Sequence, residues 1–312
     1  MLARSFWCIT LDAMTTPSEI FAIRHADGKR RFLFEQMDLR GEIVHLDQVI
    51  TDASAIHSYS PGVSRLIGEF MVAAVLLAST LKFRGSLTVQ ARSDHEVPLI
   101  MAECSSELTV RAIARGTEAA TSDSFEALLG GGQLVLCVTP ERGKRYQGIV
   151  PLTGGSLASS LDGYFSQSEQ LQTRLQLSSD GKRAAGLLLQ QLPPQLETSA
   201  PNREEQWDRV CMLAATLSPE ELIELGDATL LHRLYHEEVI RLFDLEPVRF
   251  RCSCSQDRTL AALATIGEQE IRDILGEQGA VTMDCEFCNQ RYVFREGDLR
   301  GLLGPDDGAA IH

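Results

Sequence analysis

Cys252-Ser253-Cys254, followed about thirty residues later by Cys285-Glu286-Phe287-Cys288, is the stretch that decides how the end of this chain folds. Thiolate sulfurs favour zinc in closed tetrahedral sites, and two close cysteine pairs supply four such ligands. A site of this kind has no open position for a substrate or a water molecule. The four cysteines therefore predict one zinc ion that holds residues 251–312 together and catalyses nothing.

The surroundings of the two pairs support a charged metal site that can be oxidised. Basic side chains flank the pairs and would offset the negative charge of four thiolates around zinc; they are Arg249, Arg251, Arg258 and Arg291. A single residue separates Cys252 from Cys254, whereas structural knuckles use two or more, so these sulfurs are unusually close and open to a strong oxidant. The alternative is a zinc ribbon whose metal is purely structural.

The size of residues 251–312 makes the metal important for their stability. Zinc binding supplies roughly 10–16 kcal/mol in small domains, and a link across the segment from Cys252 to Cys288 is worth ~4 kcal/mol by the loop-entropy model. A disulfide that closes only a short ring is worth ~2 kcal/mol by the same model. A module this small has little core of its own, so we expect it to unfold when the metal is lost.

Residues 197–250, called the connector below, are predicted to be helical and strongly acidic. Ser218-Pro219-Glu220-Glu221 places a capping residue, a proline and a capping-box glutamate in succession, and we expect Gly226 to close that helix. A second helix is predicted from Asp227. High charge and no large core predict a segment of low stability that can detach from its support, and an ordinary helical linker is the alternative.

The earlier part of the chain mixes strand and helix patterns. We predict strands at 39–44 and 84–91, a buried helix at 63–81, and a hairpin whose strands cover 133–138 and 145–152. The fold class is α+β, with four parts: 1–27, a disordered extension; 28–196, a mixed α/β-sheet domain; 197–250, a metastable helical linker; 251–312, a small α+β zinc-binding domain. Met14 is an alternative start to Met1.

Composition excludes several classes of protein. The 312 residues carry 43 acidic and 29 basic side chains, a net charge of -14, which disfavours nucleic acid as a partner. The longest apolar run, Phe70 to Ala78, is about half of what a bilayer-spanning helix needs, so we expect no membrane partner. Eight unevenly placed cysteines fit a reducing cytosol better than a secreted disulfide scaffold.

No pattern favours an enzyme. His232 and His236 have helical spacing, but Arg233 stands where a zinc protease needs glutamate. The run Gly130-Gly131-Gly132 lacks the residues of a phosphate-binding loop, and no serine lies in a nucleophile elbow. Two alternatives remain: a zinc ribbon that binds nucleic acid or protein, and a thiol oxidoreductase that uses Cys285 and Cys288.

The cysteines and several other stretches resemble the heat-shock protein 33 family of redox-regulated holdase chaperones. The similarity runs from about Arg31 to Glu296 and includes these segments: Phe32-Leu33-Phe34-Glu35, Leu39-Arg40-Gly41-Glu42, Leu81-Lys82-Phe83, Leu87-Thr88-Val89-Gln90, Arg145-Tyr146-Gln147-Gly148, Tyr164-Phe165, Ser168-Glu169-Gln170-Leu171 and Arg233-Leu234-Tyr235-His236-Glu237-Glu238. The first 27 residues lie outside it. Cys8, Cys104, Cys137 and Cys211 match no motif of the family and could add side disulfides.

This resemblance implies a cytoplasmic, ATP-independent chaperone with a redox switch. In the reduced state it implies zinc on Cys252, Cys254, Cys285 and Cys288 and no activity. Under oxidation with unfolding stress it implies two disulfides, Cys252 with Cys254 and Cys285 with Cys288, and loss of zinc. The switch and connector then unfold and a dimer binds unfolding client proteins, which pass later to ATP-driven refolding chaperones. Apolar connector residues between Trp207 and Leu234 are candidates for the client surface.

Overall fold

The computed structural model describes residues 26–80, 84–153, 155–168 and 172–303. The chain forms two compact units, the first ending at Arg251 and the second beginning at Cys252. Each unit is described by itself below. The extension predicted for 1–27 lies mostly outside the described residues, but Asp27 belongs to the first unit. Its carboxylate accepts hydrogen bonds from the backbone N–H groups of Asp47 and Val49.

The first unit contains two sheets. Sheet A has the order β10-β1-β2-β9-β8, all antiparallel, and β11 also pairs with β1. Its strands are β1 (Gly28–Phe34), β2 (Leu39–Leu46), β8 (Thr173–Ser179), β9 (Ala184–Gln191), β10 (Ile240–Leu242) and β11 (Glu246–Pro247). Sheet B has the order β12-β5-β4-β3-β6-β7, and only the β12–β5 pairing is parallel. Its strands are β3 (Gly85–Arg92), β4 (Leu99–Ser105), β5 (Thr109–Arg115), β6 (Gln133–Pro140), β7 (Tyr146–Pro151) and β12 (Arg249–Phe250).

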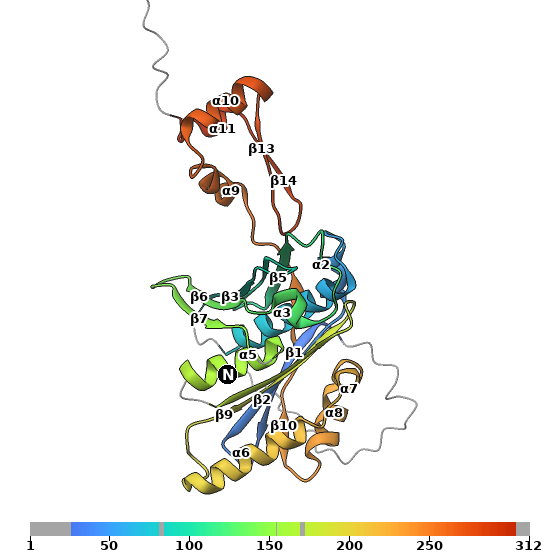
Figure 1. The fold of residues 1–312 in the computed structure, drawn as a ribbon. Coiled ribbons are helices and arrows are strands. Elements are labelled where there is room, and N and C mark those ends of the chain that lie inside the picture. Colours follow the sequence, from blue (N-terminus) through green and yellow to red (C-terminus); the bar gives the residue numbers. More distant parts are fainter. Residues whose placement is uncertain (1–25, 81–83, 154, 169–171, 304–312) are drawn as a thin grey trace, which may run out of the picture. The chain divides into compact units, whose positions relative to one another are not determined.

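One long helix, α3 (Pro61–Ala78), packs between the two sheets (Figure 1). Its first half carries Ser64, Arg65 and Glu69, but from Phe70 to Ala78 it is apolar on all sides, as expected of a helix buried in a core. By length and composition α3 could cross a membrane, but 78% of it is buried inside the protein. Strand β9 approaches it closely because Gly186 has no side chain, and a Cβ there would lie 2.4 Å from Val72 Cγ1.

The predicted elements of this unit are present with small shifts. The buried helix begins at Pro61 and ends at Ala78, while the predicted end, Leu81, lies outside the described residues. The predicted hairpin is β6 and β7. Three short helices complete the two-sheet core: α2 (Gln48–Ser54), α4 (Phe125–Leu129) and α5 (Leu157–Ser168).

The connector packs on the face of sheet A that is turned away from α3. It contains the helices α6 (Ala200–Ala214), α7 (Pro219–Glu224) and α8 (Asp227–Tyr235). Apolar residues of these helices form one buried cluster with residues of β1, β2 and β9; among them are Trp207, Val210, Leu231, Tyr235, Phe32, Phe34, Ile43, Leu187 and Leu189. Sheet A is therefore buried on both faces, and the expectation that the connector has no large core was wrong.

Two further details of the connector differ from the prediction. It is not purely helical, because its last residues form β10, β11 and β12, which extend sheets A and B. The predicted capping box is confirmed: the Ser218 side chain accepts from the Glu221 N–H, and the Glu221 carboxylate accepts from the Ser218 N–H. Gly226, however, does not close α7, which ends at Glu224; it is the residue that precedes α8.

The second unit is small. It contains α9 (Gln256–Leu263), α10 (Glu268–Gln278), the hairpin β13 (Val281–Asp284) and β14 (Arg291–Phe294), and α11 (Glu296–Leu299). Its buried apolar residues are Leu263, Ile271, Val281, Phe294 and Leu299. Five side chains are a minimal core for a unit of this length, which agrees with the prediction that it needs a further cross-link.

Asp38, in the turn between β1 and β2, fastens the start of the connector. Its carboxylate accepts hydrogen bonds from the backbone N–H groups of Gln195, Leu196 and Glu197, and it pairs with Arg203 Nη1 at 3.0 Å. Burial alone would raise the pKa of Asp38, but these donors and the Arg203 charge outweigh it and hold the pKa below its usual 3.8.

We expect Asp38→Asn to loosen the start of the connector at neutral pH by about 1–3 kcal/mol of opening free energy, because several donors lose a charged acceptor. A depressed folded-state pKa adds stability above the unfolded-state value, and that stability disappears as the pH falls through the folded-state value. Hydrogen exchange of residues 195–203 should therefore differ between variant and parent at pH 7 and converge as the pH falls through the depressed folded-state pKa of Asp38. An equal difference at both pH values would contradict this role.

Candidate metal centre

Each cysteine pair lies at the junction of two short elements of the second unit. Cys252 and Cys254 lie directly before α9, whose first turn is capped by the Ser255 side chain accepting from the Arg258 N–H. Cys285 and Cys288 lie in the turn between β13 and β14. In that turn the Cys285 carbonyl accepts from the N–H groups of Cys288 and Asn289.

The four sulfur atoms converge. All lie within 4.8 Å of one another. Cys252 Sγ is 3.6 Å from Cys285 Sγ, and Cys254 Sγ is 3.4 Å from Cys288 Sγ. Four sulfurs at the usual zinc–sulfur bond length of about 2.3 Å around a tetrahedral ion would be about 3.8 Å apart. The spacing therefore fits a tetrahedral zinc ion, and all four residues are free thiols.

The raised pKa values of the clustered thiols show that four thiolates would need a bound cation. Burial, together with the neighbouring thiols, raises the pKa of Cys285 and Cys288. The Tyr292 hydroxyl donates to Cys254 Sγ over 3.1 Å, and this hydrogen bond raises the pKa of Tyr292 to about 12. Four crowded sulfurs therefore disfavour the thiolate form by themselves, and a bound divalent cation reverses that preference.

Two of the predicted basic residues have defined partners. Arg258 Nη1 donates to the carbonyl and hydroxyl oxygens of Ser253, between the first two cysteines. Arg291 pairs instead with Asp284, at 2.8 Å. Only the first of these places its charge on the cysteine loop. Tyr292 could not be predicted from the sequence, because nothing in the pattern of β14 shows that a hydroxyl reaches a sulfur.

The other residues considered from the sequence lie away from this cluster. Cys104 and Cys137 are buried within the first unit, Cys211 is half-buried on α6, and Cys8 lies outside the described residues. His232 and His236 face each other on the exposed side of α8, with ring centres 6.1 Å apart. The glycine run 130–132 is a turn between α4 and β6. Neither of these last two features joins the four sulfurs.

Comparison with known proteins gives one consistent family. The family model described as "Hsp33 protein" matches residues 27–295. A 33 kDa chaperonin of Ectopseudomonas mendocina (strain ymp) is 48% identical over 280 residues, covering 89% of this chain and 95% of that protein. A 33 kDa chaperonin of Pseudomonas aeruginosa (strain UCBPP-PA14) is 47% identical over 282 residues, again covering 89% of this chain and 95% of the relative.

A solved structure supports the fold. The crystal structure of the 33 kDa chaperonin (heat shock protein 33 homolog) of Thermotoga maritima matches with a TM-score of 0.73 and 23% sequence identity. The match covers 88% of this chain and 97% of that one. On the family match, the long alignments at nearly half identity and the shared fold, this chain belongs to the Hsp33 family.

Proposed function

We propose that this protein is a redox-regulated, ATP-independent holdase chaperone whose four-cysteine cluster is its switch. The observation that carries the proposal is the convergence of four sulfurs within 4.8 Å in a unit with only five buried apolar side chains. Relatives named 33 kDa chaperonin support the chaperone activity. The proposed parts are those of the sequence analysis: a chaperone core at 28–196, the connector, and a switch at 251–312.

In the reduced protein, Cys252, Cys254, Cys285 and Cys288 hold one zinc ion, which supplies a cross-link between the two cysteine pairs and keeps all four sulfurs as thiolates. Tyr292 adds a hydrogen bond to Cys254 Sγ, and Arg258 fixes the loop between Cys252 and Cys254. These residues keep the second unit folded. In this state the apolar face of the connector is packed on sheet A and cannot bind other proteins.

Oxidation converts the four thiolates into two disulfides, Cys252 with Cys254 and Cys285 with Cys288. Two molecules of peroxide accept the four electrons and, with four protons, leave as four molecules of water. The sulfurs no longer act as ligands, so the cross-link between the pairs is lost. Each new disulfide closes only a short ring, which stabilises the unit by about 2 kcal/mol against the roughly 10–16 kcal/mol of a structural zinc site.

Loss of the cross-link unfolds the second unit, and the connector then leaves sheet A. Both the connector helices and the outer face of sheet A become exposed, and such apolar surface binds unfolding client proteins. We propose that the oxidised form acts as a homodimer in the cytoplasm and passes its clients to ATP-driven refolding chaperones. Nucleic acid and membranes have no part in this proposal.

Replacing one ligand tests the metal centre. We expect the reduced protein to retain one zinc ion through gel filtration, and Cys285→Ser to lose it and to unfold residues 252–303, since the small core cannot compensate. Zinc content by atomic absorption and hydrogen exchange of this unit measure both effects. Cys211→Ser is the matched control, because this half-buried thiol lies on α6, and it should keep its zinc. A reduced parent without zinc would contradict the site.

The chaperone activity is tested by light scattering from a denatured client protein diluted into buffer. The peroxide-treated, warmed protein should suppress the scattering in about equimolar amounts, and the reduced protein should not, because its apolar surface is covered. Suppression that is equal in both states would rule out redox control. Salt-dependent retention of nucleic acid by the reduced protein would favour a zinc-ribbon binding module, and catalytic turnover of a dithiol would favour an oxidoreductase.

The disulfide pairing can be mapped by mass spectrometry of peptides from the oxidised protein. We expect Cys252 linked to Cys254 and Cys285 linked to Cys288. The alternative pairing is Cys252 with Cys285 and Cys254 with Cys288, because these sulfurs approach each other in the reduced protein. Links of that kind would keep the two ends of the unit joined after oxidation. Finding them would contradict the proposed unfolding of the switch.

A further inference from the structure

Several ion pairs join the connector to sheet A and its loops. Glu246 of the connector pairs with the buried Lys29, whereas two other pairs are exposed at the edge of the contact: Arg241 with Glu35, and Arg183 with Glu224. Each has at least one partner whose side chain is more than half exposed, and the Arg183–Glu224 distance is long at 3.8 Å. Exposed pairs of this kind contribute little to stability.

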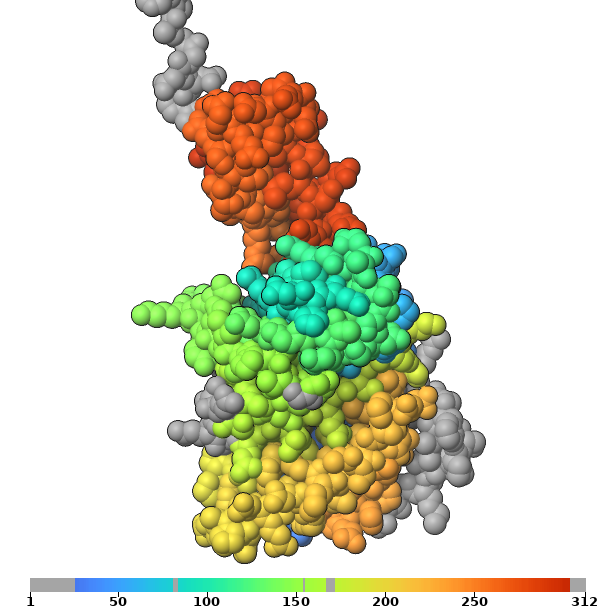
Figure 2. Space-filling view, viewed as in Figure 1, coloured from blue at the N-terminus to red at the C-terminus, as the bar shows by residue number. Residues whose placement is uncertain are grey.

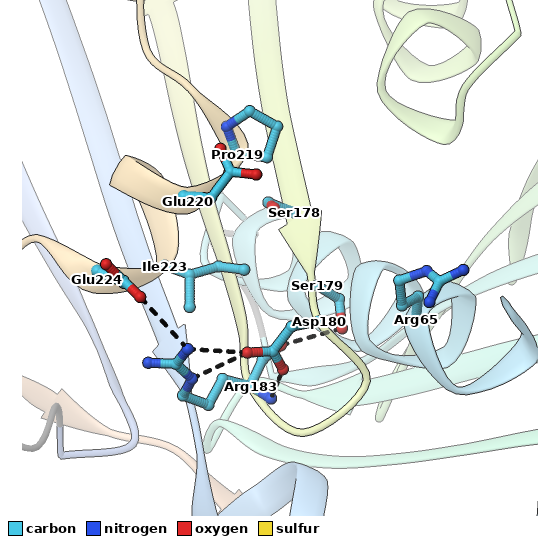
Figure 3. Close-up of a pocket in the computed structure, with 9 residues that line it drawn as sticks. All are labelled: Arg65, Ser178, Ser179, Asp180, Arg183, Pro219, Glu220, Ile223 and Glu224. Atoms are coloured by element: carbon cyan, nitrogen blue, oxygen red, sulfur yellow. Dashed lines mark hydrogen bonds and ion pairs between the residues drawn. The ribbon is translucent and has the colours of Figure 1, made fainter. Parts of the chain in front are cut away.

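The helix α7 packs on sheet A through the buried side chains of Leu222 and Ile223, and it covers a hollow in the surface. A cavity of about 350 Å³ lies beneath it, lined by residues of α3, β8, the β8–β9 turn and α7 (Figure 3). The Arg183 side chain spans this gap, pairing with Asp180 at its own turn and reaching Glu224 on α7 (Figure 3). At α7 the connector is therefore held by apolar burial, and the ion pair across the hollow contributes little.

At α8 the attachment includes a buried polar contact. Asp227, the first residue of α8, lies 3.0 Å from Arg30 Nε on β1 and 3.2 Å from His45 Nε2 on β2. The side chains of His45 and Asp227 are only 7% and 13% exposed. Arg30 and His45 lie on the same face of sheet A as Phe32 and Ile43, because side chains alternate along a strand.

The apolar contacts of the connector surround this polar one. Leu230, Leu231 and Leu234 follow Asp227 on α8 and are buried in the cluster on sheet A. Apolar burial is not directional and would tolerate a small shift of the helix. The Asp227 carboxylate, held between a guanidinium and an imidazole, fixes the position of α8 on the sheet. Arg30 Nε lies 3.0 Å from Asp227 Oδ2 but is not aligned for a hydrogen bond with any described residue, so its contact with Asp227 is between charges.

We propose that Asp227 is the positioning residue that fastens the connector to sheet A through Arg30 and His45, independently of the metal centre. The second unit begins at Cys252, and all three residues belong to the first. The connector then has its own threshold for release, set by a contact that oxidation does not touch. The consequence for client binding rests on the proposed function, whereas the fastening itself does not.

Removing Asp227 should open α8, because the buried His45 and the half-buried Arg30 would lose their acid. We expect amide hydrogen exchange in residues 227–238 of reduced, zinc-loaded Asp227→Ala and Asp227→Asn to be about 10- to 100-fold faster than in the parent, the range for leaving a buried polar group without its partner. Arg30→Met should have a similar effect. The double variant Arg30→Met/Asp227→Asn should open less than the product of the single effects predicts, because the two residues act on each other.

The matched control is Glu238→Gln. Glu238 pairs with Arg209 on α6, so this variant removes an ion pair inside the connector and leaves the contact with sheet A intact. Zinc content and hydrogen exchange of residues 252–303 are measured in every variant and should equal those of the parent. A merely structural defect would change these readouts as well.

The outcomes separate the fastening from the proposed function. Exchange at α8 that is no faster than in Glu238→Gln, additive effects in the double variant, or zinc lost on substitution of Asp227 would each overturn the proposal. Faster exchange with zinc retained and with suppression of aggregation in the absence of oxidant supports both. Faster exchange with zinc retained but without suppression supports the fastening and contradicts the connector as the cover of the client surface.

Discussion

Four sulfur atoms within 4.8 Å of one another are the constraint on which the end of this protein depends. Residues 252–303 bury five apolar side chains, and a core this small does not fold a segment of that length without a cross-link. Zinc bound by these four residues as thiolates would supply such a link, and its stability would depend on the oxidation state of its own ligands. The same four residues can therefore be both the support of the unit and the point at which it fails.

The first unit is stabilised by its own apolar core, because both faces of sheet A are buried. Its inner face packs on α3, and its outer face packs on the connector, so strands β2 and β9 carry apolar residues on both sides. The inner contact belongs to a core that includes sheet B, whereas the outer one depends on helices that continue through β12 into Cys252. Removing the connector would leave the two-sheet core in place and uncover a sheet face that is already apolar.

Much of this arrangement could be predicted from the sequence, and the failures have physical causes. The cluster of four cysteines and the helices at Pro219 and Asp227 were predictable because cysteine spacing and capping residues are local signals. The connector's core was missed because its partners, such as Phe32 and Leu187, are far away in the sequence. The strands β10 to β12 were missed because two or three residues show no periodicity. Tyr292 and Asp38 act through single contacts that no local pattern reveals.

Some charged residues of the connector attach it to sheet A, which its composition alone did not show. Acidic helices usually suggest a solvated surface, and the sequence favoured low stability for this reason. In the folded protein one of these acids, Asp227, meets Arg30 and His45 on sheet A, and one connector base, Arg203, meets Asp38. Apolar burial brings the connector to the sheet, and these buried pairs determine where it stops. Because charge pairs lose their value in water, a connector that has once left the sheet gains little from them until it returns to the same place. The attachment is therefore specific when closed and weak when open, which would suit release of the connector as a whole in the proposed switch.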